Sequence, residues 1–460
     1  MRLLPILSAA ILAAMGGFAG ELPPGMAAKI DEIATKALAE GGPPSVSIAV
    51  AREGKIAYEK AYGKARLDPP MDARPEMRYN IGSVSKQLAA GATLLLVQDG
   101  KLSLDDRVAR YLPDLTRAGE ITIRQLLSHT SGYQDYWPQD YVPPFMLQPV
   151  TADGILNQWA KKPLDFDPGT CWQYSNTNFV VAGRIIEQVT GGPFSAFLAK
   201  RILQPLGMNS AMDVGLQAKG PADAIGYTRF ARGPARPAPV EGRGWLYAAG
   251  ELAMTAHDLA LWDISLMDRK LLTSASFEAL TTPVRLRNGA PTGYALGIGV
   301  ADDQGHPKLV HGGAVSGFVS LNAVWPDQGI AIVVFANEDG STAPGAVTSQ
   351  VAALLLAEAQ DPQAEPALRQ ARQIFDGLLE GRIDRSLLTP DADAFFTAQV
   401  LADAAASLQA MGPLDSLRQS SVEQRGGMTY RHFQLRFKDR TLRLDTLTMP
   451  GGKLEQYLIQ

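Results

Sequence analysis

The sequence predicts a mixed α/β (α+β) protein: an antiparallel sheet flanked by helices, with an inserted helical region, followed by a small α+β domain. Three observations support this fold class. The chain has 460 residues, more than one compact domain usually holds. Strand-like patterns occur within residues 46–58 and again within 294–335, whereas helical periodicities dominate between them. A shorter run of helix and strands follows residues 361–366, which have the composition of a linker.

The N-terminus has the features of a secretory signal peptide. Arg2 is followed by an apolar run, and small residues at Gly17 and Ala19 fit a cleavage site. The run is too short to span a membrane comfortably as an uncleaved anchor, and no other stretch approaches that length. We therefore expect export to a bacterial periplasm, without membrane insertion after cleavage. The three parts expected are a signal peptide (1–19), a large domain (20–360) and an accessory domain (361–460).

Composition argues against several classes of function. Apolar residues make up 46% of the chain and charged residues 20%, enough for a large core. The formal net charge is −4 with no basic stripe, so we expect no nucleic-acid partner. Cys171 is the only cysteine, so no internal disulfide can form, and a single buried thiol usually serves packing rather than catalysis. The five histidines show no metal-ligand spacing, and we expect neither a metal nor a cofactor.

The first elements are an amphipathic helix over 26–41 and a β-hairpin. Apolar residues alternate with small ones over 46–50, a Glu-Gly pair at 53–54 forms a turn, and the chain returns through 56–58. A run rich in alanine and leucine then predicts a buried helix from Ser83 to about Gln98.

Helices and loops alternate in the inserted region. The helical periodicities lie at Ile121–Leu127, Thr151–Trp159, Thr177–Val189 and Ala256–Leu266. Two irregular segments interrupt them: residues 133–145 carry several aromatic side chains, and residues 231–244 are rich in proline, glycine and arginine. The aromatic side chains could form the wall of a substrate cleft or simply pack the loop down.

Strand patterns return before the end of the large domain. They lie at Tyr294–Val300, Lys308–His311, Phe318–Trp325 and Ile330–Phe335. A helix over 344–358 follows, so one sheet would be assembled from both ends of the domain. In the tail, a helix near 374–379 and strands near 433–437, 442–444 and 454–459 predict a small α+β domain without an evident reactive cluster.

Ser83 and Lys86 form a Ser-x-x-Lys motif at the start of the first buried helix. Side chains three residues apart project from the same face of a helix, one turn apart. A lysine can take the proton of a serine hydroxyl if burial lowers its pKa from about 10.4. The helix N-terminus adds N–H groups that can stabilise an oxyanion. Such a pair also arises by chance, as a surface lysine near a serine.

Tyr174 and Asn176 form a Tyr-x-Asn motif that opens the next long helix, and residue alternation puts both side chains on one side. A phenol can relay a proton, and an amide can hold a substrate carbonyl or the lysine. The alternative is that Asn176 caps the helix and Tyr174 packs. The strand over 309–318 supplies a third motif, His311-Gly312-Gly313, whose glycines indicate either a close approach of ligand to backbone or a bulge.

In this order, the three motifs resemble the serine β-lactamase and penicillin-binding-protein superfamily. The likeness is greater to the branch of class C β-lactamases, D-alanyl-D-alanine carboxypeptidases, D-amino-acid amidases and β-lactamase-like esterases, whose central motif is Tyr-x-Asn. It covers roughly residues 25–360. It includes four weaker blocks typical of that branch, at 102–106, 126–132, 205–208 and 248–252. The tail resembles the nuclear-transport-factor-2-like cone domains.

The resemblance implies a role for each motif. Ser83 would be the acylated nucleophile, and Lys86 and Tyr174 would share the general-base and general-acid work. Asn176 would orient the acyl side of the substrate, as part of a binding site with His311, Gly312 and Gly313. The backbone N–H groups of Ser83 and Ala314 would form the oxyanion hole.

The sequence departs from this pattern at the third motif, which is His-Gly-Gly rather than Lys-Thr-Gly. The resemblance includes some peptidases and amidases that also carry histidine there, whereas an aromatic residue is commoner in the esterases. An imidazole with a pKa of about 6.5 is mostly neutral at pH 7, so a substrate carboxylate would lose part of its anchor. The substitution argues against a strong β-lactamase without choosing between peptide, amide and ester. His129 could in principle complete a Ser–His pair, but its polar and glycine neighbours favour a structural turn.

Two functions remain open. The first is an exported serine hydrolase that acts through an acyl-enzyme on an amide or ester, such as a peptide containing D-amino acids, with at most weak β-lactamase activity. Its partner would be a small-molecule or peptide substrate. The second is a non-catalytic penicillin-binding or sensory protein on the same scaffold, acylated at most once. The sequence leaves the oligomeric state open.

Overall fold

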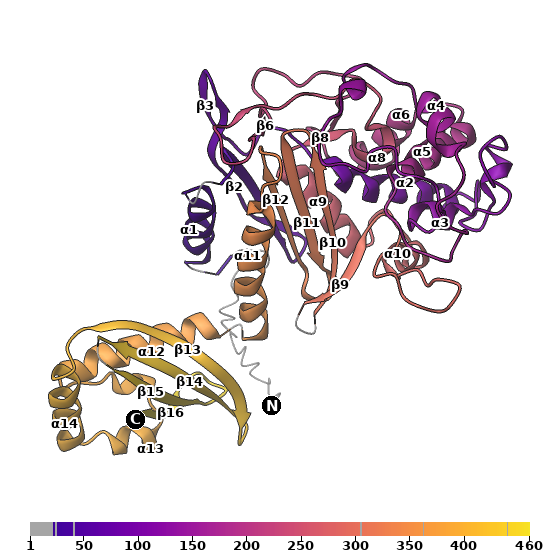
Figure 1. The fold of residues 1–460 in the computed structure, drawn as a ribbon. Helices are drawn as coiled ribbons and strands as arrows, with labels where there is room; N and C mark the ends of the chain where they lie inside the picture. Colours follow the sequence, from indigo (N-terminus) through magenta and orange to yellow (C-terminus); the bar gives the residue numbers. More distant parts are fainter. Residues whose placement is uncertain (1–21, 24, 40–41, 304–305, 362, 439) are drawn as a thin grey trace, which may run out of the picture. The chain divides into compact units, whose positions relative to one another are not determined.

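The computed structural model describes residues 22–23, 25–39, 42–303, 306–361, 363–438 and 440–460 (Figure 1). The signal peptide expected at residues 1–19 lies outside the described residues. The described residues up to Ala353 belong to one compact unit and those from Leu354 onward to a second. Among the described residues, no helix is long and apolar enough to cross a membrane.

A seven-stranded antiparallel sheet forms the frame of the first unit, which confirms the predicted fold class. Two adjacent strands near its centre come from opposite ends of the unit and pair residue by residue, with Ile48 opposite Val334. In sheet order the strands are β3 (Pro70–Asp72), β2 (Lys55–Leu67), β1 (Ser45–Arg52), β12 (Ile330–Ala336), β11 (Phe318–Trp325), β10 (His306–Val315) and β9 (Gly299–Asp303).

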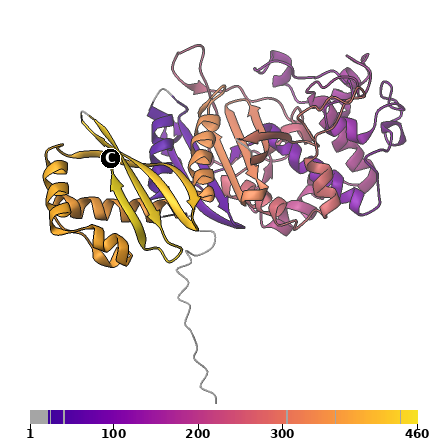
Figure 2. The same cartoon turned by 90° about the horizontal axis from the view of Figure 1, so that it is seen from below.

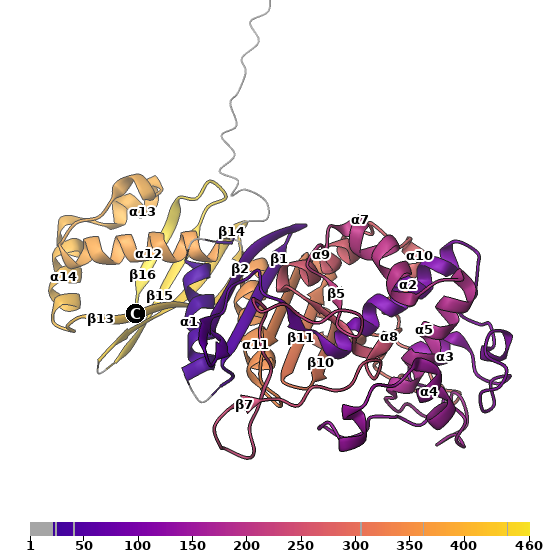
Figure 3. The same ribbon diagram turned by 90° about the horizontal axis from the view of Figure 1, so that it is seen from above.

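Helices cover both faces of this sheet. α1 (Met26–Ala39) and α11 (Ala343–Gln360) lie on one face, and α9 (Ala256–Met267) lies on the other, on the side of the inserted region (Figures 1 and 3). The strands between them are therefore buried on both sides. For that reason β12 is a continuous apolar run, every residue of which is buried, rather than an alternating pattern.

The inserted region, residues 73–298, is built around α2 (Ser85–Gln98). Every residue of α2 from Ser85 to Leu96 is buried, as its alanine- and leucine-rich sequence predicts. The other helices are α3 (Ile123–Leu127), α4 (Ala152–Ile155), α5 (Asn176–Thr190), α6 (Phe194–Leu198), α7 (Gln204–Leu206), α8 (Tyr247–Gly250) and α10 (Ser274–Thr281). The short strands are β4 (Tyr79–Asn80), β5 (Met212–Asp213), β6 (Tyr227–Thr228), β7 (Arg236–Pro237) and β8 (Leu252–Met254).

The strand predicted at Tyr294–Val300 is wrong for most of its length, because β9 begins only at Gly299. Gly297 has φ +71° and turns the chain there. Its N–H donates to the carbonyl oxygen of Leu127 at 2.9 Å. A Cβ at this position would lie 2.6 Å from the carbonyl oxygen of Lys86, so the segment packs directly on the backbone of α2.

The second unit places a four-stranded antiparallel sheet against helices (Figure 2). Phe375 and Leu378 of one helix pack in a single apolar cluster with Phe433 and Leu435 of the sheet. The helices are α12 (Ala364–Leu379), α13 (Pro390–Phe395) and α14 (Ala398–Gln409). The strands, in sheet order, are β13 (Leu414–Arg425), β14 (Met428–Phe437), β15 (Thr441–Thr448) and β16 (Leu454–Ile459).

The linker predicted at 361–366 is wrong. Helix α12 already begins at Ala364. Asp361 is buried, and its carboxylate accepts a hydrogen bond from the buried Arg431 guanidinium at 2.7 Å. Asp361 is therefore part of a buried ion pair rather than of a solvated connection.

Candidate active site

The turn that carries Ser83 is fixed by its neighbours on both sides. Ser83 lies in a short helical turn, Gly82–Val84, directly before α2. Ahead of it, the N–H of Ile81 donates to the carbonyl oxygen of Leu252 at 2.9 Å. Gly82 has φ +51°, and a Cβ there would lie 3.0 Å from the backbone nitrogen of Ala314. This close contact brings strand β10 against the serine turn.

Lys86 is fully buried, and three oxygen atoms surround its Nζ. These are Ser83 Oγ at 2.9 Å, Asn176 Oδ1 at 2.8 Å and the carbonyl oxygen of Ala249 at 2.6 Å. Burial lowers the pKa of Lys86 to about 7, against a smaller opposing effect of the Asp135 carboxylate. A neutral amine has two N–H bonds, which the two carbonyl oxygens can accept, and its lone pair then faces the serine hydroxyl. This arrangement suits a general base.

Tyr174 also contacts Ser83. Its hydroxyl donates to Ser83 Oγ at 2.7 Å. Burial raises the pKa of Tyr174, and the Asp135 carboxylate adds to that effect, so the phenol keeps its proton at neutral pH. Lys86 Nζ lies 5.0 Å from the centroid of the tyrosine ring. The serine oxygen is therefore within hydrogen-bond distance of both an amine, Lys86, and a phenol, Tyr174.

His129 contacts the segment that carries Tyr174. Its Nδ1 accepts from the backbone N–H of Ser175 at 3.2 Å, and its ring centroid is 4.3 Å from that of Tyr174. Burial holds the pKa of His129 well below its usual range, and Lys86 lowers it further, so the imidazole is neutral. The residue also has φ +58°, which fits the predicted turn. These contacts favour the structural interpretation over a Ser–His pair.

Asn176 is the first residue of α5 and makes no capping bond, so the capping alternative is wrong. Its side chain instead joins Lys86 to a carboxylate that sequence reasoning missed. The Asn176 Nδ2 donates to the two carboxylate oxygens of Asp135 at 3.2 and 3.3 Å, and its backbone N–H donates to Asp135 Oδ1 at 2.9 Å. Burial raises the pKa of Asp135. The available signal was that Asp135 is the acidic residue within the aromatic run 133–137.

His311 lies on β10 with both ring nitrogens engaged. Its Nδ1 donates to the carbonyl oxygen of Gly312 at 2.6 Å, and its Nε2 accepts from the hydroxyl of Tyr294 at 2.7 Å. Burial lowers the pKa of His311 to about 4, with a smaller contribution from Lys86. The imidazole is therefore neutral at pH 7, as the sequence predicts, and it supplies no positive charge to a substrate carboxylate.

The two glycines after His311 differ in their surroundings. A Cβ on Gly313 would lie 2.0 Å from the carbonyl oxygen of Ile81, whereas one on Gly312 would meet no atom closer than 3.8 Å. The hydroxyl of Ser320 also donates to Ile81 O, at 2.7 Å. Gly313 therefore allows β10 to contact the serine turn, where the backbone of Ala314 lies next to Gly82.

Two further expectations concern other reactive residues. Cys171 is exposed, so the expectation of a buried packing thiol is wrong. Within the part of the chain that the structure describes, no three or more His, Cys, Asp or Glu side chains are grouped as metal ligands.

Comparison with known proteins identifies a matching family model and several similar proteins. Residues 30–357 match a family model described as Beta-lactamase. The Bacillus subtilis protein PbpX, named as a penicillin-binding protein, is 29% identical over 306 residues, which cover 66% of this chain and 74% of that protein. A D-aminopeptidase of Brucella suis is 29% identical over 332 residues. They cover 71% of this chain but only 62% of the aminopeptidase.

Solved structures agree with this result. A D-stereospecific amidohydrolase from Streptomyces sp. has a TM-score of 0.62 at 28% identity, covering 70% of this chain and 97% of its own. The D-amino acid amidase of Ochrobactrum anthropi SV3, complexed with D-phenylalanine, has a TM-score of 0.64 at 25% identity, with coverages of 74% and 99%. An octameric penicillin-binding protein homologue from Pyrococcus abyssi shares the fold over 94% of this chain and 99% of its own, with a TM-score of 0.64 at 20% identity.

Proposed function

The chain belongs to the beta-lactamase family of serine hydrolases, and on that premise we propose that it hydrolyses amides and esters of D-amino acids through an acyl-enzyme at Ser83. The observation that carries this proposal is the position of Ser83 Oγ, 2.9 Å from the buried Lys86 Nζ and 2.7 Å from the Tyr174 hydroxyl. A base and an acid on one nucleophile are what acyl transfer requires.

The reaction would proceed in two halves. The Lys86 amine takes the proton of the Ser83 hydroxyl while Oγ attacks the substrate carbonyl carbon. The oxyanion that forms is held by the backbone N–H groups of Ser83 and Ala314. The Tyr174 phenol gives its proton to the leaving nitrogen or oxygen and takes the one that Lys86 holds. In the second half a water molecule attacks the acyl carbon and gives one proton to the paired Lys86 and Tyr174 groups. The same pair returns a proton to Ser83 Oγ as that oxygen leaves the acyl carbon.

The charges around the site favour an amino-acid amide over a free-carboxylate peptide or a β-lactam. Both of the disfavoured substrates carry a carboxylate on the leaving side, and His311 is neutral with both ring nitrogens engaged. Asp135 accepts a hydrogen bond from the Asn176 amide, whose oxygen in turn contacts Lys86 Nζ. Its carboxylate suits the α-ammonium group of an N-terminal amino acid. The D-aminopeptidase and D-amino acid amidase relatives act on substrates of this kind by name.

The test is hydrolysis of the p-nitroanilides of D-alanine and L-alanine. We expect steady release of p-nitroaniline with preference for the D substrate, loss of turnover in Ser83→Ala, and normal turnover in Ser103→Ala, an exposed serine away from the site. Release of one equivalent and no more would instead support the non-catalytic sensor. Nitrocefin hydrolysis measured beside it should be slow, and rapid turnover would contradict the argument from His311.

The proposal also covers the cellular location of the protein and the fold of the second unit. Residues 1–19 would direct export to a bacterial periplasm, which cell fractionation and N-terminal sequencing of the mature protein would check. The second unit would be a nuclear-transport-factor-2-like domain, an assignment supported by α12 packing on a four-stranded sheet. An experimental structure of the full chain in which this sheet is flat and open on both faces would contradict that assignment.

A further inference from the structure

A cavity of about 610 Å³ lies in the inserted region, and no step of the proposed mechanism uses it. Its volume is in the usual range for small-molecule sites, about 300–1,000 Å³. None of Ser83, Lys86 and Tyr174 is among the described residues that line it. Helix α8 contributes to both sites, because Ala248 lines the cavity and the carbonyl oxygen of Ala249 accepts from Lys86 Nζ. The cavity is therefore distinct from the catalytic site and adjoins it through α8.

Most of the cavity wall is apolar. Phe194 and Leu198 of α6 and Met212 of β5 belong to this wall and are buried. Leu216 also lines the cavity and is 67% exposed, so the cavity opens to solvent at that residue. Apolar surface that faces a solvent-accessible space is unfavourable in water. The wall therefore suits a ligand with an apolar body, which would enter near Leu216.

Two carboxyl groups meet at one place on this wall. The Asp213 Oδ1 accepts from the N–H of Gly215 at 2.9 Å and from that of Leu216 at 3.2 Å. A Cβ on Gly215 would lie 1.5 Å from the Glu251 Oε1, so the glutamate carboxyl lies against the same glycine. Both acids line the cavity, and Glu251 is only 6% exposed. Gly215 therefore has one carboxyl group on its N–H and the other where a side chain would stand.

No basic side chain neutralises this pair in the part of the chain that the structure describes. Arg243 is the one basic residue among the described residues of the wall, and it is exposed and forms no ion pair with either acid. Burial raises the pKa of Asp213, and burial reinforced by the Asp213 charge raises the pKa of Glu251. Each negative charge is therefore costly as the wall stands, and a cation beside both would reduce that cost. The Tyr247 hydroxyl, on the same wall, is buried without a hydrogen-bond partner among the described residues.

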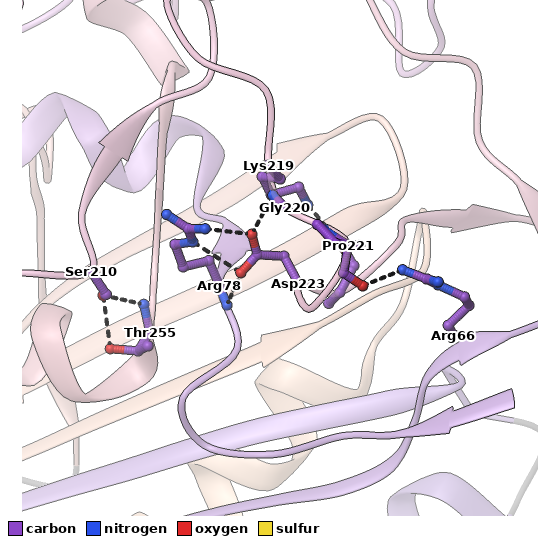
Figure 4. A network of polar contacts seen from close by, with 9 residues as sticks. Arg66, Arg78, Ser210, Lys219, Gly220, Pro221, Asp223 and Thr255 are labelled. Carbon is purple, nitrogen blue, oxygen red and sulfur yellow. Dashed lines mark hydrogen bonds and ion pairs between the residues drawn. The ribbon is translucent and has the colours of Figure 1, made fainter.

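The wall segment 210–223, which carries the aspartate of this pair, is anchored at both ends (Figure 4). At its start, the Ser210 Oγ accepts from the N–H of Thr255 at 3.0 Å. At its end, the Asp223 carboxylate accepts from the Arg78 guanidinium at 2.9 and 2.7 Å. These contacts hold the segment in place, so the cavity is formed before a ligand arrives.

We propose that this cavity binds an apolar primary amine, with the ammonium group at Asp213 and Glu251 and the apolar body along α6 and β5. An ammonium group has three N–H donors, and the two carboxylates and the Tyr247 hydroxyl offer three acceptors. Charge complementarity selects the amine, because a neutral alcohol would leave the carboxyl pair without a cation and an acid would add a third negative charge. The inference goes beyond the proposed function and does not depend on acylation of Ser83.

The test measures binding of three probes with one apolar body to the full chain by isothermal titration calorimetry at neutral pH. The probes are 4-phenylbutylamine, 4-phenylbutanol and 4-phenylbutyrate. We expect the Kd of the amine to be about tenfold or more below that of the alcohol, and the acid to bind most weakly. The advantage of the amine should fall toward one in Glu251→Gln and in Asp213→Asn. It should persist in Glu278→Gln and Asp114→Asn, which change exposed acids outside the cavity wall.

A second set of variants locates the bound amine. A neighbouring cavity of about 550 Å³ shares Gly215 and Glu251 with this one, but Ala211 lines only the proposed site and Ala218 only the neighbour. Ala211→Trp should therefore abolish binding of the amine, whereas Ala218→Trp should leave its Kd unchanged. Asp135→Asn should also leave the Kd unchanged, because that carboxylate belongs to the catalytic site.

The outcomes separate this inference from the proposed function. Equal affinity for the three probes would overturn the amine site, as would loss of amine binding in Asp135→Asn or in Ala218→Trp. The amine should leave the KM for p-nitrophenyl acetate unchanged, and competitive inhibition would show that it occupies the catalytic site instead. Absence of p-nitrophenyl acetate turnover would overturn the hydrolase but not the amine site. Should the variants fail to fold, the order of affinities for the three probes in the wild type still decides.

Discussion

Removing the charge of Asp135 should change the pH at which Lys86 becomes an active base. The link between them runs from Lys86 Nζ through the Asn176 amide to the Asp135 carboxylate, with contacts of 2.8 and 3.2 Å. These two contacts and the amide between them limit the distance between the charges to about 8 Å, and at that distance an effective dielectric constant of about 20 gives about 2 kcal/mol. Partial exposure of Asp135 reduces this, so we expect a change of about one pH unit.

The direction of the shift in the pH profile follows from the protonation state of Lys86 that acts as the base, which is the neutral amine. The wild-type kcat/KM on p-nitrophenyl acetate should rise with pH through about 7 as Lys86 loses its proton, and then level off. The Asp135 carboxylate raises the pKa of Lys86, so in Asp135→Asn the rise should move to lower pH. Asp140→Asn, an exposed acid of the same loop, serves as the control and should leave the profile in place. An unmoved profile in Asp135→Asn, or one moved to higher pH, would refute Lys86 as the titrating base.

Three further changes test the site and the core. Tyr174→Phe should slow p-nitroanilide hydrolysis about 10²- to 10⁴-fold and p-nitrophenyl ester hydrolysis much less, because only the amine leaving group needs its proton; equal losses in both assays would contradict the acid role. Gly313→Ala should cost about 1–3 kcal/mol in urea unfolding and abolish turnover, because its Cβ would lie 2.0 Å from Ile81 O, whereas Gly312→Ala should do neither. Burial raises the pKa of the Asp263 carboxyl to about 8, so the folded state keeps a proton that the unfolded chain releases near pH 4. The free energy of unfolding of the wild type should therefore fall as pH rises between these values. The free energy of unfolding of Asp263→Asn should match that of the wild type near pH 4 and exceed it by about 2 kcal/mol or more near pH 8. Parallel curves of unfolding free energy against pH would show that Asp263 is ionised in the folded protein.

The helices and strands that are specified by residues close together in the sequence could be predicted from the sequence. The alternation over 46–58 and the apolar runs at 318–325 and 330–336 identify strands, and the alanine- and leucine-rich run after Ser83 identifies the buried helix. The predicted secondary structure was wrong where a contact between residues far apart in the sequence determines the local conformation. The chain at 294–298 has strand composition, but Gly297 turns it against α2. Asp361 has linker composition, but Arg431 buries it.

The sequence by itself identified the candidate nucleophile and its candidate base, because Ser83 and Lys86 lie about one helical turn apart and local geometry brings them together. Only the tertiary structure decided what these residues can do. The lowered pKa of Lys86 comes from complete burial in α2, and the acid on Ser83 comes from Tyr174, which is 91 positions further along the chain. Asp135, the engaged His311 and the cavity beside α8 were likewise set by packing. Burial and electrostatic effects depend on everything that surrounds an atom, whereas a sequence pattern reports only on neighbours along the chain.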